Sequence, residues 1–148
     1  MTKFDEELKR LQSRFVWLSN NVSPFLMDTL IGREAEIEDL NAGQLEQGKD
    51  STGDDIKPDY TPFTKSIKQA KGQPTNRVTL KDEGDFYKSI EYKVQQKGLE
   101  YQATDPKTDA LQEKYGDEIL GLDAQSITEI TLIILDSLHK KLQTLLLK

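Results

Sequence analysis

The stretch "VTLKDEGDFYKSI" (78–90) decides the expected fold, because its apolar residues change periodicity within a few positions. The first part alternates apolar and polar residues, which is typical of the end of a β-strand with one face on the core. A charged turn follows, where Gly84 permits a positive φ or a close backbone approach. The later apolar residues lie four apart, as on one helical turn. We expect a strand-to-helix corner formed by Val78, Leu80, Gly84, Phe86 and Ile90.

The N-terminal third predicts two helices joined by a short turn. The first covers residues 4–19, because its large apolar residues are spaced four, three, four and three along one narrow stripe. The members of this stripe are Phe4, Leu8, Leu11, Phe15 and Leu18. The second helix is expected over residues 24–47, since Pro24 suits the first helical position after a serine cap. Interior glycines predict a bend in this second helix, near Gly32 or Gly43.

A long polar segment, residues 48–76, follows these helices. It holds three of the five prolines and three glycines, and loops of this length usually bind something or are disordered. One short helix can begin inside it, with Thr61 as its cap and Pro62 at its first position. We predict an extended arm that reaches a partner. Its expected interface residues are aromatic or basic: Tyr60, Phe63, Lys65, Lys68, Lys71 and Arg77.

Downstream of the corner, alternating residues predict a β-hairpin over 91–105, with "QQKG" (95–98) as its turn. Residues 106–116 predict a short helix or ordered loop that closes at Gly116. The two strands are expected to carry their tyrosines and aliphatic residues on one face.

The last helix begins after Asp123, which can cap it, and Ser126 with Glu129 offers a capping box. Its apolar residues occupy a wide arc, so we expect contacts on more than one side. The core should therefore come mostly from the N-terminal third and from this final helix.

Together these elements predict an α+β fold, with an N-terminal helical pair, a small antiparallel sheet with a short helix, and a long C-terminal helix. A chain of 148 residues fits a single domain. Its expected parts are the helical residues 1–47, the arm or loop 48–76, and the sheet with the C-terminal helix, 77–148.

The composition narrows the function classes. The net charge of −6 and the isoelectric point near 4.9 argue against nonspecific binding to nucleic acid, although residues 65–77 form a local basic stretch without acids. We expect no sequence-specific contact with nucleic acid. There is no cysteine, and the only histidine is His139, so neither a thiolate nor a pair of histidines can act. The run "DSTGDD" (50–55) lacks EF-hand spacing and predicts a polar turn. We expect no enzyme activity, no cofactor or metal ion, and no membrane span, because charges interrupt the most apolar run.

Three stretches carry a resemblance to a known family. They are "LNAGQLEQGKDSTGDDIKPDYTPFT" (40–64), the corner stretch, and "YGDEILGLDAQSITEITLIILDSL" (115–138). The third stretch has a glycine, Gly116, followed by an Ile-Leu-Gly-Leu segment that contains Leu120, Gly121 and Leu122 and opens the final helix. In this order, over roughly residues 36–142, the chain resembles the tail-completion or virion-morphogenesis proteins of tailed bacteriophages. It departs from the pattern at Glu83, where the family usually has threonine, and at "GDEIL" (116–120).

The resemblance implies a structural virion protein of the phage neck, in the head–tail connector. Such a protein would act as a homo-oligomeric ring, with other connector or tail proteins as partners. It would be assembled in the host cytoplasm and found in the virion. The alternative is a small acidic soluble binding module, or a regulator of a basic protein partner. The connector predicts ordered assembly, whereas the module predicts a monomer or dimer with one ligand.

Overall fold

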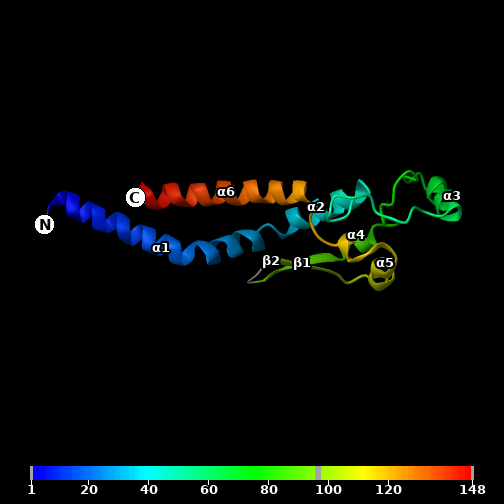
Figure 1. Cartoon of the computed structure of the whole chain (residues 1–148), viewed down its shortest axis with the longest axis horizontal. Helices are drawn as coiled ribbons and strands as arrows, with labels where there is room; N and C mark the ends of the chain where they lie inside the picture. The colour runs from blue at the N-terminus through cyan, green and yellow to red at the C-terminus, as the bar shows by residue number, and fades with distance from the viewer. Residues whose placement is uncertain (1, 96–97, 148) are drawn as a thin grey trace. The chain divides into compact units, whose positions relative to one another are not determined.

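The computed structural model describes residues 2–95 and 98–147, apart from the side chains of residues 18 and 146. The fold is mixed α+β and mostly helical, with one two-stranded antiparallel sheet among the described residues (Figure 1). The chain forms two compact units. The helical unit comprises Met1–Arg33 and Ile130–Lys148, and the mixed unit comprises Glu34–Glu129.

The helical unit consists of α1 (Lys3–Ile31) and most of α6 (Ala124–Leu146), which runs back in the opposite direction (Figure 1). Thr2 caps α1 through a capping box. The Thr2 hydroxyl accepts from the Asp5 N–H at 3.2 Å, and the Asp5 carboxylate accepts from the Thr2 N–H at 2.8 Å. These bonds satisfy backbone donors that the first turn of a helix leaves without partners.

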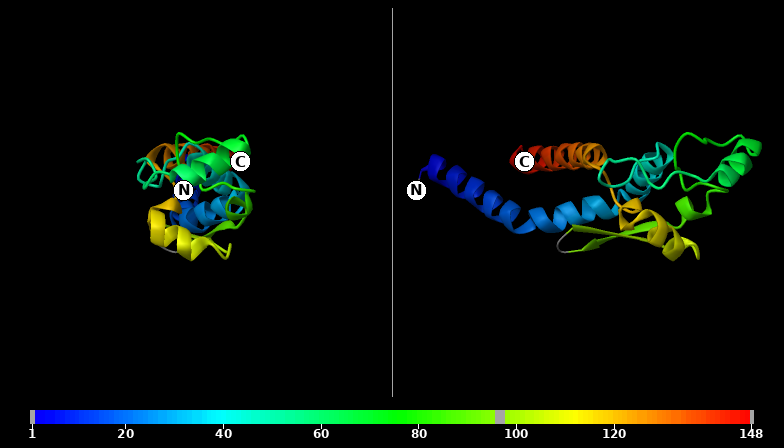
Figure 2. Two further views of the ribbon diagram at one scale, coloured as in Figure 1. Left: turned by 90° about the vertical axis from the view of Figure 1, so that its right-hand side faces the viewer. Right: turned by 45° about the vertical axis from the view of Figure 1, so that its right-hand side comes forward.

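The predicted break between residues 19 and 24 is wrong, because Pro24 lies inside α1. Proline removes one N–H from the helical ladder, and a long helix can accommodate that loss by bending. The ribbon of α1 changes direction partway along (Figure 2). The chain instead leaves the helix at Gly32, whose N–H donates to the Asp28 carbonyl at 3.0 Å. The predicted single helix over residues 24–47 is therefore wrong: the helix is interrupted at Gly32 and Arg33, close to one of the two glycines where a bend was expected, and a separate helix begins at Glu34.

The mixed unit contains the remaining elements. In chain order they are α2 (Glu34–Glu46), α3 (Pro62–Ala70), α4 (Asp85–Lys88), β1 (Ile90–Gln95), β2 (Gly98–Ala103), α5 (Thr108–Tyr115) and the 3₁₀ helix η1 (Asp117–Ile119). The predicted cap of α3 is confirmed, since the Thr61 hydroxyl accepts from the Thr64 N–H at 3.2 Å. The predicted helix before Gly116 is confirmed as α5.

The predicted hairpin is confirmed. Tyr92 lies opposite Tyr101 and Val94 opposite Leu99, so these four side chains share one face of the sheet. The two tyrosine rings are 6.2 Å apart between centroids. The expected turn "QQKG" includes residues 96–97, which lie outside the described residues.

The hydrophobic core lies in the mixed unit, so the expectation of a core built from the chain's two ends is wrong. Its members are Leu45, Ile56, Tyr60, Val78, Leu80, Phe86, Ile90 and Ile119. Two of them belong to the polar segment 48–76, which the core therefore holds in place instead of leaving it extended. Four belong to the corner stretch, as its pattern of apolar residues suggested.

The expected strand at 77–80 is wrong, although Val78 and Leu80 are buried. The backbone N–H groups of Thr79 and Leu80 both donate to the Tyr60 hydroxyl at 3.0 Å, where a strand would have used a neighbouring strand. Leu80 has a φ of 56°, which no strand residue adopts. One tyrosine side chain thus satisfies this segment's buried donors.

The rest of the corner is close to its prediction. Gly84 has a φ of 94° and precedes α4, so the expected positive φ is confirmed. Phe86 is buried on α4. The helix ends at Lys88, however, so Ile90 anchors the first strand and not the helix.

Two buried amides join α2 to the segment before α6. The Asn41 side chain accepts from the Gly121 N–H at 3.2 Å, and the Gln44 side chain accepts from the Asp123 N–H at 2.7 Å while donating to the Gly121 carbonyl at 3.2 Å. Asp123 in turn caps α6 by accepting from the Ser126 N–H at 2.8 Å, as predicted. The predicted capping box at Ser126 is wrong, because the helix already begins at Ala124.

Candidate functional sites

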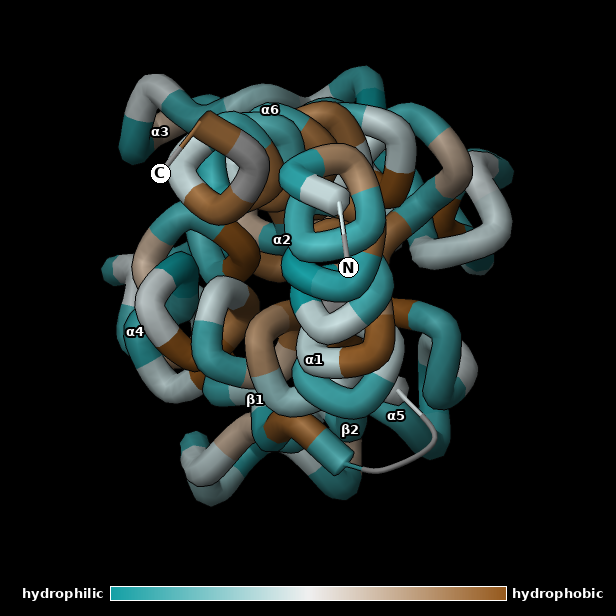
Figure 3. Tube along the Cα trace, turned by 90° about the vertical axis from the view of Figure 1, so that its left-hand side faces the viewer, coloured by the Kyte–Doolittle hydropathy of each residue, from teal (hydrophilic) through white to brown (hydrophobic). Residues whose placement is uncertain are grey.

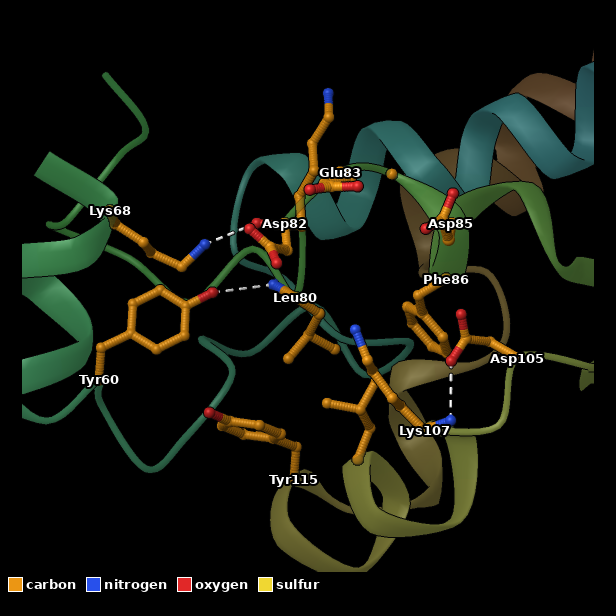
Figure 4. Close-up of a pocket in the computed structure, with 13 residues that line it drawn as sticks. Tyr60, Lys68, Leu80, Asp82, Glu83, Asp85, Phe86, Asp105, Lys107 and Tyr115 are labelled. Carbon is orange, nitrogen blue, oxygen red and sulfur yellow. Dashed lines mark hydrogen bonds between the residues drawn. The ribbon is translucent and has the colours of Figure 1, made fainter. Parts of the chain in front are cut away.

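The corner forms one wall of a cavity of about 340 Å³ in the mixed unit (Figure 4). Helices α3 and α5 supply the other walls. Its lining combines aromatic and aliphatic side chains with charged ones: Tyr60, Lys68, Leu80, Lys81, Asp82, Glu83, Gly84, Asp85, Phe86, Asp105, Lys107, Leu111 and Tyr115. We call this space the corner cavity.

Lys68, an expected interface residue, is a structural cation in the wall of the corner cavity. Lys68 is only 7% exposed. The ammonium donates to the Lys81 carbonyl at 2.6 Å and to the Gln73 side-chain oxygen at 3.0 Å. It also lies 4.8 Å from the centroid of the Tyr60 ring, within the range of a cation–π contact. Tyr60 itself is buried, so neither residue offers a free contact surface.

Carboxylates outnumber ammonium groups around the corner cavity. The acids are Asp82, Glu83, Asp85 and Asp105, against Lys68, Lys81 and Lys107. A hydrogen bond from Lys71 lowers the pKa of Asp82 below its usual value, and the same bond raises the pKa of Lys71. Lys81 likewise pairs with Glu46, which lies outside the lining. The lining groups that remain are Glu83, Asp85 and Asp105 against Lys68 and Lys107, an excess of one negative charge that suits a cationic side chain from a partner.

The other expected interface residues do not gather on one surface. Phe63 is 75% exposed on α3, and Lys65 is half-buried. Lys71 pairs with Asp82. Arg77 forms a hydrogen bond within the mixed unit, where its Nε–H donates to the Glu46 carbonyl at 2.7 Å. The predicted arm interface is therefore divided between buried, paired and exposed positions.

The motif before the last helix has a structural role in the mixed unit. Leu122 is buried, and Leu120 packs against the core. Gly121 has a φ of 120°, and a Cβ built there would lie 3.2 Å from the Cβ of Ser51. A side chain at this position would strain the backbone and crowd Ser51.

The helical unit leaves large apolar side chains exposed on both of its helices, and Figure 3 shows hydrophobic stretches along α1 and α6. They are Phe4, Leu8, Leu11, Phe15, Val16, Trp17 and Ile31 on α1, and Leu132 and Leu135 on α6. The sequence predicted the stripes but assigned them to a core. Large exposed apolar patches are characteristic of surfaces that bind proteins, membranes or ligands.

The described part of the chain lacks a candidate metal centre. It contains no group of three or more acids or histidines placed to hold a metal ion. Among the described residues, no helix combines the length and apolar character needed to cross a membrane. His139 is exposed on α6.

No family model matches this chain, and neither does any curated protein or any solved structure. The resemblance to phage tail-completion proteins therefore stays a prediction.

Proposed function

We propose that this protein is a structural subunit of the head–tail connector of a tailed bacteriophage. The observation that supports this most is the exposed apolar surface of the helical unit. Burying one leucine or phenylalanine side chain contributes roughly 1.5–3 kcal/mol, so several of them together provide a strong drive to assemble. The resemblance of the three motifs to tail-completion proteins is the reason for proposing a connector as the assembly.

In this proposal identical copies form a ring around the tail axis, and other connector or tail proteins bind above or below it. A ring needs head-to-tail contacts that close after a fixed number of copies. The acidic corner cavity is a suitable receptor for a basic side chain of the neighbouring copy. Such a charged contact would set the register of the ring, while the apolar surfaces supply most of the affinity.

Reconstruction of assembled particles tests the proposal. We expect the chain in several copies around the tail axis. A single copy off that axis, or absence from the particles, would refute the connector role.

A matched pair of α6 variants adds a functional readout. Leu132→Asp places a charge on an exposed apolar position, and Gln143→Asp changes an exposed polar position on the same helix. We expect Leu132→Asp to lower the yield of tailed particles about tenfold, as removal of an interface anchor does. Gln143→Asp should keep the yield. Equal yields from both variants would count against α6 as an assembly surface.

The second candidate function is a binding module for a basic protein, and the carboxylates of the corner cavity favour it. An oligolysine peptide is a direct probe, with Asp85→Asn as the test variant and Asp39→Asn, exposed on α2, as its control. Tight binding that only Asp85→Asn weakens would support the module.

A further inference from the structure

The first half of α1 has the pattern of a coiled-coil seam. Phe4, Leu8, Leu11 and Phe15 are spaced four, three and four residues apart. This is the strict alternation that keeps one narrow stripe facing a partner helix in a two-stranded coiled coil. Their exposed fractions are 70, 46, 40 and 58% respectively, so the described residues leave much of this stripe open to solvent.

The charges along this half-helix are ordered, and their order identifies the partner. After Lys3, an acidic block occupies residues 5–7, and three cations, Lys9, Arg10 and Arg14, follow it. Two copies lying parallel and in register would place acid beside acid and base beside base. Two antiparallel copies would place each acidic block opposite the basic residues of the other copy.

The heptad positions identify which charged side chains would meet across the antiparallel pair. Glu7 and Arg14 occupy equivalent places, one residue before the seam residues Leu8 and Phe15. Positions of this kind flank the seam and carry the charges that set partner choice and orientation in coiled coils. In an antiparallel pair, Glu7 of each copy lies beside Arg14 of the other, so the attraction occurs twice.

We propose that two copies of this chain pair through the first half of α1 as an antiparallel coiled coil. Phe4 packs opposite Phe15 of the second copy, and Leu8 packs opposite Leu11. The contact has two-fold symmetry, so it joins two copies and does not itself close a ring. The pairing covers only the first half of α1, so the other exposed apolar residues of the helical unit, among them Leu132 and Leu135 on α6, stay available for the head-to-tail contacts of the proposed connector. The pairing does not rest on that function.

Sedimentation of the full chain at concentrations from about 1 to 100 μM tests the pairing. We expect the wild type to dimerise in this range. Glu7→Arg and Arg14→Glu should each weaken the dimer about tenfold, because each creates two repulsive pairs. An equimolar mixture of the two variants should restore the association as a heterodimer, since both contacts then join opposite charges.

Matched controls carry the same charge changes away from the seam. Glu6→Arg and Arg10→Glu lie on the outer face of the predicted coiled coil and should leave the dimer unchanged. Leu8→Asp should abolish it, with circular dichroism confirming that the helices remain. A dimer that survives Leu8→Asp uses another surface, which would overturn the proposal.

Disulfide trapping determines the orientation, because the chain has no cysteine of its own. A mixture of Phe4→Cys and Phe15→Cys chains should give the mixed disulfide in preference to the two symmetric ones. A preference for the symmetric disulfides would overturn the antiparallel orientation. A wild type that stays monomeric throughout the concentration range, or a variant mixture that does not re-associate, would overturn the pairing itself.

Discussion

The mixed unit and the helical unit use their apolar residues in opposite ways. Among the described residues, Ile130 is the only member of the helical unit in the set of buried large hydrophobic side chains, and the others lie in the mixed unit. Most of the exposed large hydrophobic side chains lie in the helical unit. The exceptions are Phe63, Ile67 and Ile127, which belong to the mixed unit. The mixed unit thus covers its own core, whereas the helical unit presents apolar surface to the solvent.

This contrast indicates where the molecule is complete and where it needs a partner. In the mixed unit, the side chains of Tyr60, Asn41 and Gln44 accept hydrogen bonds from backbone N–H groups around the core and so satisfy these donors. The helical unit relies on helix caps and on local contacts, such as Lys141 placed 5.9 Å from the Trp17 ring. Its stability should therefore depend on assembly, and that of the mixed unit should not.

Shortening one leucine in each unit tests this difference most directly and should give the largest effect on stability. Leu45 is fully buried in the mixed unit, and Leu132 is 61% exposed in the helical unit. Leu45→Ala should lower the free energy of unfolding by about 2–5 kcal/mol, because it leaves a cavity. Leu132→Ala should change it by less than about 0.5 kcal/mol in the isolated chain. Urea denaturation measures both, and equal losses would mean that the helical unit has a core of its own.

Alkaline pH should destabilise the mixed unit, which holds all five tyrosines. Burial, and then the nearby Glu34 and Glu38, raise the pKa of Tyr92 to about 12, from an ordinary value of 10.0. The folded state holds this proton more tightly than the unfolded state does. Its contribution is therefore fully present below pH 10 and is lost as the pH rises toward 12.

Tyr92→Phe isolates this effect. The wild type should lose about 2 kcal/mol more stability than the variant between about pH 9 and pH 12. Urea unfolding at several pH values, followed by circular dichroism, provides the measurement. Burial also raises the pKa of Tyr87 and Tyr101, so the variant should keep part of the alkaline loss. Identical pH profiles would contradict the buried position of Tyr92.

The smallest expected changes in stability come from two glycines of the mixed unit that have opposite roles. Gly84→Ala should destabilise by about 1 kcal/mol, because Gly84 has a φ of 94° that a Cβ disfavours. Gly43→Ala should stabilise by about 1 kcal/mol, because Gly43 lies inside α2 with open space around its Cα. Thermal melts would show opposite shifts. Shifts of the same sign would contradict the turn at Gly84 or the helix at Gly43.

The sequence predicted the elements whose causes are local. Helical spacing identified both long helices, alternation identified the hairpin, and Thr61 and Asp123 identified two helix starts. Pro24 misled the prediction, because a proline costs one hydrogen bond and a long helix absorbs that loss by bending. The corner cavity could be foreseen only in part, from the apolar residues of the corner and the turn at Gly84.

The buried polar residues could not have been found from the sequence. Asn41 and Gln44 lie on the face of α2 that also carries the buried Ile37 and Leu45, and this spacing was the one available signal. Their partners are more than seventy residues away. Lys68 gave no signal either, since a lysine in a polar helix usually faces water.

Local sequence pattern specifies which residues share a face and where most elements begin, because caps, glycine conformations and periodicity act over a few residues. The tertiary structure decided which faces are covered. It buried Lys68 and Tyr60, replaced a strand at Thr79 and Leu80 by bonds to one hydroxyl, and left the stripe of α1 exposed. Burial depends on segments that are distant in the chain, and local pattern does not specify which of them meet.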